Sequence, residues 1–281
     1  MAEIGFMQGR LSPLVEGKIQ AFPWSKWRDE FPAAQALGIR LMEWTLDHER
    51  LVENPLMTST GRAEIRQLSE KHQVDVRSLT GDVFMQKPFW RVTGSERSER
   101  LQEFDAIAES CAKIGIKFIV VPLVDNGAMT TPAEEAAVIT EFKQRSKWLR
   151  QSGLAVLFEC DYPPKKLARF VEEFPEEQFG INYDIGNSAA LDYDSAEEIA
   201  AYFPRILNVH IKDRLLGGGT VPLGTGNANL AATLTDLVKR RYRGFYILQT
   251  ARAADGDHAG VLAKYRDMAQ GWIEAAQKGV T

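Results

Sequence analysis

Cysteine is scarce in this 281-residue chain, and long apolar runs are missing. Its two cysteines, Cys111 and Cys160, are too few for a disulfide framework or a cysteine-based zinc module, and they fit a reducing compartment. No apolar stretch approaches the roughly 20 residues that a membrane-spanning helix needs, and the N-terminus lacks the basic start and apolar run of a signal peptide. We therefore expect a cytoplasmic protein without membrane association.

An excess of positive charge is also missing. Lys and Arg number 34 against 38 Asp and Glu, which gives a formal net charge of -4. A general nucleic-acid binder needs a basic surface to meet phosphate, so this balance argues against that class. Because the hydrophobic share of 44% is ordinary for a globular protein, we expect a folded domain whose partner is a small molecule.

The chain does have a regular alternation of short apolar runs with longer amphipathic stretches. The runs predict β-strands at residues 4–8, 39–44, 74–79, 117–122, 154–159, 179–184, 206–212 and 244–249. Helical patterns lie between and after them, among others at 24–37, 60–72, 95–114, 132–149 and 257–278. Pro132 suits the first turn of its helix. Strand–helix alternation of this kind indicates a parallel sheet.

Eight strand–helix units in a chain of this length are typical of a closed (β/α)8 barrel. The competing fold, an open doubly wound sheet, usually carries a glycine-rich turn after its first strand, where this chain has residues 7–13 (MQGRLSP). Neither a linker nor a low-complexity tract divides the chain. We therefore predict an α/β fold, a (β/α)8 TIM barrel, in which residues 1–281 form a single domain.

The segment 80–95 is a predicted long loop that is rich in large apolar side chains, among them Phe84, Phe89 and Trp90. Long loops in compact domains are often lids over functional sites. The alternative is a loop packed on its own hydrophobic side chains. The sequence leaves both interpretations open.

Side chains that can bind a metal ion end the last four predicted strands. They are Glu159, Asp184, His210 and Gln249. The carboxyl ends of the strands form the functional face of a barrel, so these four side chains are expected to meet there. Two carboxylates, an imidazole and an amide oxygen suit a divalent ion such as Mn2+, Mg2+ or Zn2+. We predict one divalent metal ion at this position.

The alternation of side chains along these strands supports the same prediction. Successive side chains of a strand point to opposite faces. If the four polar residues face the barrel axis, their neighbours must face the helices, and those neighbours are apolar or aromatic. They are Phe158, Cys160, Tyr183, Ile185, Val209, Ile211 and Leu248. A carboxylate inside a barrel is costly unless it is paired, hydrogen-bonded or bound to a metal ion.

Several motifs give the chain a resemblance to a known family. They are residues 7–13 (MQGRLSP), 20–24 (QAFPW), 158–159 (FE), 184–187 (DIGN), 210–213 (HIKD) and 224–226 (GTG). Over nearly its whole length the chain resembles the xylose-isomerase-like TIM barrels, also called sugar-phosphate isomerase/epimerase-like proteins. The resemblance implies an enzyme that acts on a small sugar, sugar phosphate or related keto compound. Because relatives often pair, it also implies a homodimer or homotetramer.

In the ketose 3-epimerases of this family, Glu, Asp, His and Glu from the last four strands hold one metal ion that polarises the substrate carbonyl. The resemblance assigns the first three positions to Glu159, Asp184 and His210, and it makes Glu159 a catalytic proton-transfer residue. The fourth position holds Gln249, whose amide can bind a metal ion but cannot take up a proton near neutral pH. Three functions therefore stay open: isomerisation or epimerisation with Glu159 as the base, dehydration by a lyase, and sugar binding without turnover.

The strand ends and the resemblance also suggest substrate-binding residues. Glu43 ends the second predicted strand, and Asn187 stands where relatives often carry a substrate-binding His. Lys212 shares the orientation predicted for the histidine two residues before it. Arg10 and Arg252 follow the first and last strands, where a guanidinium group can hold a phosphate or carboxylate.

A DNA-repair endonuclease of the same superfamily is a further alternative. Those members use three metal ions with many His ligands, whereas this chain has four His in total. Its acidic balance also fits duplex phosphate poorly. The sequence therefore favours the sugar enzyme.

Overall fold

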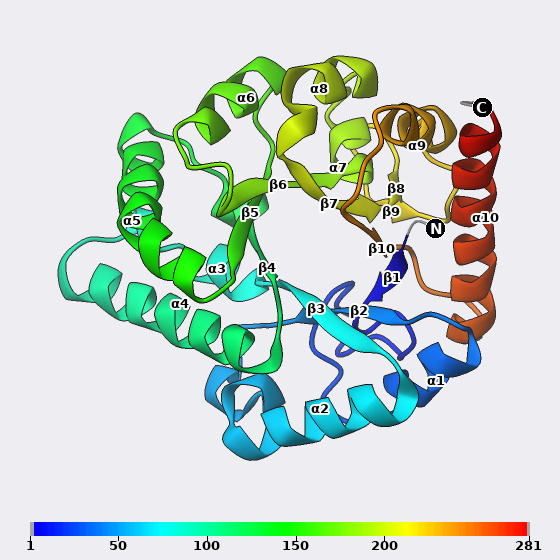
Figure 1. Ribbon diagram of the computed structural model, residues 1–281, viewed down its shortest axis with the longest axis horizontal. Helices are drawn as coiled ribbons and strands as arrows, with labels where there is room; N and C mark the ends of the chain where they lie inside the picture. Colours follow the sequence, from blue (N-terminus) through cyan, green and yellow to red (C-terminus); the bar gives the residue numbers. More distant parts are fainter. Residues whose placement is uncertain (1–2, 280–281) are drawn as a thin grey trace.

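The computed structural model describes residues 3–279 as a closed parallel barrel surrounded by helices (Figure 1). The barrel strands are β1 (Ile4–Met7), β2 (Leu41–Thr45), β3 (Asp75–Thr80), β4 (Phe118–Leu123), β5 (Ala155–Cys160), β6 (Phe179–Asp184), β7 (Ile206–Ile211) and β10 (Phe245–Leu248). Their order around the barrel is β1-β10-β7-β6-β5-β4-β3-β2. The predicted α/β fold, a (β/α)8 barrel in one domain, is confirmed.

Helices connect the strands, and most of them form the outer layer. They are α1 (Glu30–Ala36), α2 (Ser59–His72), α3 (Asp82–Gln86), α4 (Gly94–Ile114), α5 (Pro132–Gln151), α6 (Pro164–Glu172), α7 (Ile185–Ala190), α8 (Ser195–Tyr202), α9 (Leu230–Lys239) and α10 (His258–Lys278). None of the helices within residues 3–279 is long and apolar enough to cross a membrane.

The predicted barrel strands agree with the structure to within two residues at either end. The short strands β8 (Asp213–Arg214) and β9 (Thr220–Val221), which pair as an antiparallel hairpin, escaped prediction because two residues carry no periodic pattern. The helix expected at 24–37 is shorter than predicted, since α1 begins at Glu30. Pro32 explains this difference, because proline is tolerated in the first turn of a helix but not in its interior.

The segment 80–95 is not the long irregular loop that the sequence suggested. It contains α3 and the 3-10 turn η3 (Phe89–Arg91). Phe84, Phe89 and Trp90 are buried in the main hydrophobic core, and the indole of Trp90 donates to the Gly127 carbonyl at 3.1 Å. The large apolar side chains therefore anchor this segment against the barrel.

Local signals place several helices as expected. Pro132 is the first residue of α5, and Thr131 and Glu134 form a capping box around that helix start. At the C-terminus of α4, Gly115 adopts a φ of 85°, a left-handed conformation that suits glycine at the end of a helix.

The core has two parts, which correspond to the two faces of the strands. The larger part lies between the barrel and the helices and contains Phe158, Tyr183, Val209 and Leu248. Two small clusters occupy the alternate strand positions, so they face the barrel axis. They are Met7, Leu41 and Ile247, and Val120, Ala155 and Leu157. The predicted alternation of outward and inward side chains is therefore present in the barrel.

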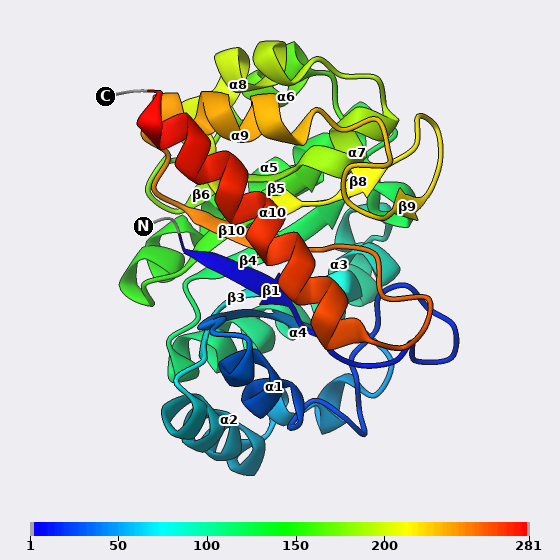
Figure 2. The same ribbon diagram turned by 90° about the vertical axis from the view of Figure 1, so that its right-hand side faces the viewer.

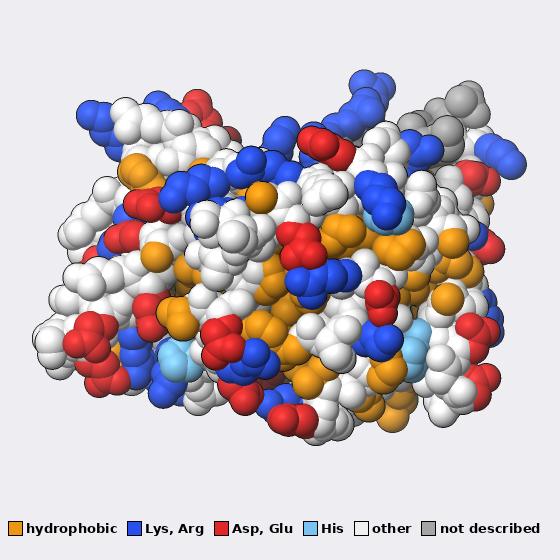
Figure 3. Space-filling model, turned by 90° about the horizontal axis from the view of Figure 1, so that it is seen from below, with side chains coloured by type: hydrophobic (Ala, Val, Ile, Leu, Met, Phe, Trp, Pro, Cys, Tyr) orange, Lys and Arg blue, Asp and Glu red, His pale blue; other side chains and the backbone are white. Residues whose placement is uncertain are grey.

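The loops at the carboxyl ends of the strands gather at one end of the molecule. Figure 2 shows α3, α7, the β8–β9 hairpin and the segments that follow β1 and β10 at that end. On the face seen in Figure 3, basic and acidic side chains are interspersed, with hydrophobic side chains between them. Barrel enzymes carry their active sites at this end of the strands, so we expect the functional site there.

Candidate active site

Three side chains at the ends of β5, β6 and β7 form a compact group of potential metal ligands. Glu159, Asp184 and His210 are all buried, and one ligand atom from each lies within 4.8 Å of the other two. The Nδ1 atom of His210 is 3.4 Å from Oε2 of Glu159 and 3.8 Å from Oδ2 of Asp184. A mixed set of carboxylate and imidazole donors at this spacing fits a divalent metal ion.

Two amides hold the Glu159 carboxylate in place. Asn182 donates from Nδ2 to Oε2 of Glu159 at 2.7 Å, and Asn187 donates from Nδ2 to Oε1 at 2.7 Å. Asn187 lies in α7, whose N-cap residue Asp184 accepts the Asn187 backbone N–H at 2.8 Å. Both oxygens of Glu159 are therefore oriented by residues of β6 and α7.

A buried carboxylate orients the imidazole of His210. Glu43, the middle residue of β2, places Oε1 2.7 Å from Nε2 of His210, and it also accepts hydrogen bonds from Thr80 and Asn208. Burial opposes the charged forms of both groups. The ion pair outweighs it, so the pKa of Glu43 is lowered and the pKa of His210 is raised well above its usual value. Protons would therefore compete with any metal ion for this imidazole.

The ammonium of Lys212 lies beside the metal-ligand group. It donates to Oδ2 of Asp184 at 2.9 Å, to Oδ1 of Asn187 at 2.9 Å and to Oε1 of Gln249 at 3.2 Å. Burial acts against ionised Asp184, but Lys212 first and His210 next hold the pKa of that carboxyl well below its usual range. Gln249 is thus connected to the ligand group through Lys212.

A cavity of about 290 Å³ opens above these residues. Its lining includes Gln20, Thr80, Asp82, Glu159, Asn187, Lys212, Arg214 and Gln249. Arg214 donates from Nη1 to Oδ1 of Asn187 at 2.8 Å. Most of the lining residues carry hydroxyl, amide or charged groups, which suits a hydrophilic ligand that offers several hydrogen-bonding oxygens.

The structure separates the five substrate-binding residues suggested by the sequence. Asn187 and Lys212 line the cavity, whereas Glu43 is completely buried behind His210. Arg10 and Arg252 both donate to the Ile19 carbonyl, and Arg252 also donates to Gly9 at 2.8 Å and Ser12 at 3.0 Å. These two guanidinium groups fix the segment after β1.

Burial and the proximity of Arg252 lower the pKa of Arg10 to about 9. The segment that the two arginines hold brings Ile19 and Gln20 to the cavity wall. Gln20 in turn accepts from Nη2 of Arg10 at 3.3 Å. Both arginines therefore contribute to the shape of the cavity, although neither is among its lining residues.

Two further buried carboxylates shape loops around the site. Glu30 accepts the backbone N–H groups of Gly9 and Leu11 and the hydroxyl of Ser12, at 2.9 to 3.0 Å. Asp213 does the same on the opposite side, where it accepts three N–H groups from the loop 224–228. The motif residues 9–12 and 224–226 are therefore positioned by buried acids.

Asp82 and Gln20 are among the residues of the cavity lining that sequence reasoning did not single out. Asp82 is the first residue of α3, 5% exposed, and Oδ2 accepts a hydrogen bond from Nε2 of Gln20 at 2.7 Å. Oε1 of Gln20 accepts from Nε2 of Gln249 at 2.9 Å. The sequence predicts an irregular loop at 80–95, so Asp82 does not stand at the end of a predicted strand. The search for functional residues at strand ends therefore did not include it.

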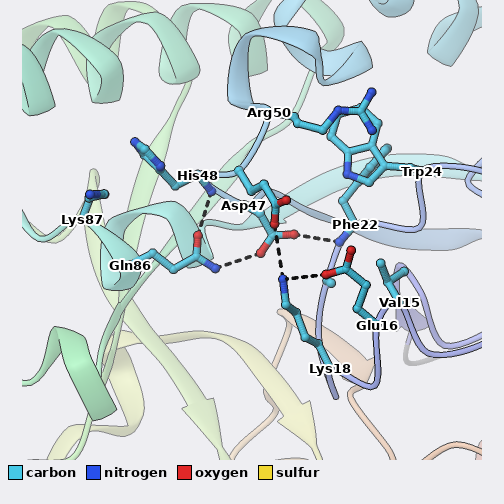
Figure 4. A pocket seen from close by; sticks show the side chains of 12 residues that line it. Val15, Glu16, Lys18, Phe22, Trp24, Asp47, His48, Arg50, Gln86 and Lys87 are labelled. Atoms are coloured by element: carbon cyan, nitrogen blue, oxygen red, sulfur yellow. Dashed lines mark hydrogen bonds and ion pairs between the residues drawn. The ribbon is translucent and has the colours of Figure 1, made fainter.

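Figure 4 shows a second cavity, of about 440 Å³. Gln86 lines both cavities, donates to Asp47 at 2.9 Å and accepts from the backbone N–H of His48 at 2.7 Å. Lys18 in its wall pairs with Glu16 and Glu49. The end of α3 therefore forms part of the wall between the two cavities.

Comparisons with known proteins identify the family of the chain. The family model described as xylose isomerase-like TIM barrel matches residues 31–276. The L-ribulose-5-phosphate 3-epimerase of Escherichia coli O1:K1 is 31% identical over 258 residues, which cover 89% of each chain. The chain belongs to the xylose isomerase-like TIM barrel family. These matches make it a sugar isomerase/epimerase-like enzyme, as the resemblance implied.

Solved structures show the same fold along the whole chain. The xylose isomerase domain protein from Planctomyces limnophilus superposes with a TM-score of 0.75 at 17% identity, covering 99% of both chains. An L-ribulose 3-epimerase superposes with a TM-score of 0.76 at 13% identity, covering 99% of this chain and 97% of its own. At these identities the likeness concerns the fold alone.

Proposed function

We propose that this protein is a divalent-metal-dependent epimerase or isomerase that acts on a small ketose or ketose phosphate. The observation that carries the proposal is the group of Glu159, Asp184 and His210, whose ligand atoms lie within 4.8 Å of one another at the carboxyl ends of the strands. The 31% identity to an L-ribulose-5-phosphate 3-epimerase supports the choice of substrate class. The polar lining of the cavity supports it independently.

Glu159, Asp184 and His210 would hold one Mn2+, Mg2+ or Zn2+ ion, with the amide oxygen of Gln249 as the fourth ligand. The bound ion would supply polarisation of a substrate carbonyl. Gln249 Oε1 now accepts from Lys212, so Lys212 and a metal ion would share the oxygens of Asp184 and Gln249. The ammonium group is positioned to donate to the substrate or to hold these two side chains.

Glu159 is the residue proposed to remove the proton next to the carbonyl. Its two amide donors leave it oriented toward the cavity that it lines. Asn187, Lys212 and Arg214 would bind substrate oxygens on the same wall. A carboxylate held in one orientation lowers the cost of reaching the geometry for proton transfer.

Metal analysis by mass spectrometry tests the ligand set. We expect about one equivalent in the purified protein and loss of the metal in Glu159→Ala and His210→Ala, with Glu198→Gln as the control. Glu198 is also buried, but its partners are Tyr183, Tyr202 and Ser188. A parent protein that takes up no Mn2+, Mg2+ or Zn2+ would contradict the metal dependence.

Incubation with L-ribulose 5-phosphate and with D-fructose in D2O tests the reaction. Deuterium in the recovered sugar, together with a new epimer or isomer, is expected from reversible proton transfer. Loss of water from the sugar would instead support a dehydratase. Tight binding without either change would support a sugar-binding barrel without turnover. A homodimer or homotetramer and a cytoplasmic location are also part of this proposal, and light scattering and cell fractionation test them.

A further inference from the structure

Proton transfer to the second face of a substrate needs a group that Gln249 cannot provide. A 3-epimerisation breaks a C–H bond on one face of the sugar and makes a new one on the other. Glu159 supplies a carboxylate on one wall of the cavity. The amide of Gln249 does not exchange a proton near neutral pH, so a different acid has to act on the other face.

Asp82 is a second carboxyl group in the same cavity. It lies at the start of α3, beyond the end of β3, whereas Glu159 lies on β5. The strand between them, β4, contributes Pro122 to the lining, so the two acids approach the cavity from different sides of that strand. A chain of hydrogen bonds runs from Asp82 through Gln20 to Gln249. The side chain of Gln20 therefore links Asp82 to Gln249 across the cavity wall.

The surroundings of Asp82 favour a carboxyl group that can give and take a proton. Burial first, and then the nearby Asp47 and Glu159, raise the pKa of Asp82 to about 7, against the opposing effects of Gln20 and Arg10. None of the ion pairs within residues 3–279 includes Asp82. A general acid or base works best when its pKa lies near the working pH.

A purely structural role does not need a carboxyl group at this position. The N-cap of α3 is Gly81, and no side chain caps that helix. The single side-chain hydrogen bond that Asp82 makes, with the amide of Gln20, could equally be accepted by an asparagine. Asp82 is also outside the group of Glu159, Asp184 and His210 that fits a metal ion. A buried acid that forms no close ion pair and whose hydrogen bond does not require a carboxyl group is typical of a functional group.

We propose that Asp82 is the second catalytic proton-transfer residue and acts on the face of the substrate opposite Glu159. In one direction, Glu159 takes the proton as the C–H bond breaks, and the electron pair passes toward the carbonyl oxygen to give an enediolate. The carboxyl of Asp82 then gives its proton to the other face, where the enediolate electron pair forms the new C–H bond. Water afterwards removes the proton from Glu159 and returns one to Asp82. The reverse reaction exchanges the two roles. This inference rests on the proposed function.

The experiment compares both epimers of a ketose pair in D2O. The wild type, Asp82→Asn and Asp161→Asn are loaded with Mn2+ and incubated separately with D-fructose and with D-psicose, its C3 epimer, and in parallel with L-ribulose 5-phosphate and its C3 epimer. Deuterium at C3 and conversion between epimers are followed by NMR. Asp161 is a half-buried aspartate that follows β5 and is not among the cavity-lining residues, so it serves as the control.

We expect Asp82→Asn to lower interconversion at least about 100-fold, while deuterium still enters C3 of one epimer and not of the other. This one-sided exchange is a signature that a general loss of structure would not produce. The Mn2+ content should match that of the wild type, and the melting temperature should not fall below that of the wild type. Asp161→Asn should behave as the wild type in every measurement.

Two results would overturn the assignment of Asp82. One is interconversion in Asp82→Asn within about tenfold of the wild type. The other is loss of exchange from both epimers in a variant that melts and binds Mn2+ normally. A wild type that neither exchanges nor converts either pair would instead refute the proposed function on these ketoses, and the role of Asp82 with it. The two failures are therefore distinguishable.

Discussion

The imidazole of His210 and the carboxylate of Glu43 form a completely buried pair inside the barrel, with Nε2 2.7 Å from Oε1. The two residues come from β7 and β2, which β1 and β10 separate in the barrel order. With Nε2 directed at Glu43, the other ring nitrogen faces Glu159 and Asp184. A carboxylate behind a metal-binding histidine fixes the ring orientation and raises its basicity.

This pair predicts that Glu43→Gln weakens metal binding without removing a ligand. We expect a loss of about 10- to 100-fold in Mn2+ affinity, because a glutamine replaces the charged partner of His210. Isothermal titration of the metal-free protein measures the affinity. Glu198→Gln, a change at a buried glutamate away from the site, should leave it unchanged. Equal affinities of Glu43→Gln and wild type would contradict an orienting role.

The position of the Lys212 ammonium predicts that it competes with the metal ion for the carboxylate of Asp184. In Lys212→Met, Asp184 loses its partner at 2.9 Å, and the metal-free protein should lose about 3 kcal/mol of stability because a buried carboxylate loses its nearest cation. Added Mn2+ would compensate that charge, so it should raise the melting temperature of the variant more than that of the wild type. Scanning calorimetry with and without Mn2+ measures both shifts. Equal shifts would mean that Lys212 and the metal ion do not share Asp184.

The raised pKa of Asp82 predicts that the stability of the substrate-free protein depends on pH. Its pKa is raised from 3.8 to about 7 in the folded protein, so the folded state binds the proton more tightly than the unfolded state. The resulting stabilisation is complete below about pH 4 and is lost as the pH rises through about 7.

Relative to Asp82→Asn, the wild type should therefore lose a few kcal/mol between pH 4 and 8, because each tenfold difference in proton affinity corresponds to about 1.4 kcal/mol. Urea unfolding of both proteins across this range provides the comparison. Asp192→Asn, an exposed change, should follow the wild-type curve. Parallel curves for Asp82→Asn and wild type would show that the carboxyl is not protonated on folding.

The close packing around Gly226 predicts that the loop held by Asp213 has no room for a side chain at this position. A Cβ atom at Gly226 would lie 2.6 Å from the Arg214 carbonyl oxygen and closer still to Oδ1 of Asp213. Gly226→Ala should therefore cost about 1–3 kcal/mol, as expected when a close-packed region is overfilled. Gly219→Ala is the matched control, because nothing lies within 4 Å of its Cβ position. Thermal unfolding compares the two, and equal melting temperatures would contradict the packing argument.

The sequence determined the strands and the residues at their ends. Side chains alternate in direction along each strand, and this alternation is a local property of the sequence. It alone placed Glu159, Asp184 and His210 on the axis side of the barrel. It likewise placed Phe158, Tyr183 and Val209 against the helices. The apolar runs likewise located the barrel strands to within two residues. These features depend on neighbours in the chain, which the sequence contains directly.

Contacts across the barrel were decided only by the tertiary structure. Barrel closure and the register shifts at Met42/Glu43 and Ile181/Asn182 determine which axis-facing side chains meet. They place Glu43 behind His210 rather than in the lining of the cavity, and they bring Lys212 to Asp184.

Loop segments depend on the tertiary structure for the same reason. Arg10 and Arg252 are 242 positions apart, yet both donate to the Ile19 carbonyl, and Asp82 reaches Gln249 through Gln20. No periodic pattern relates residues at such separations, because their contact depends on how the whole chain closes. The sequence therefore determined which chemical groups stand at the strand ends, and the fold determined which of them act together.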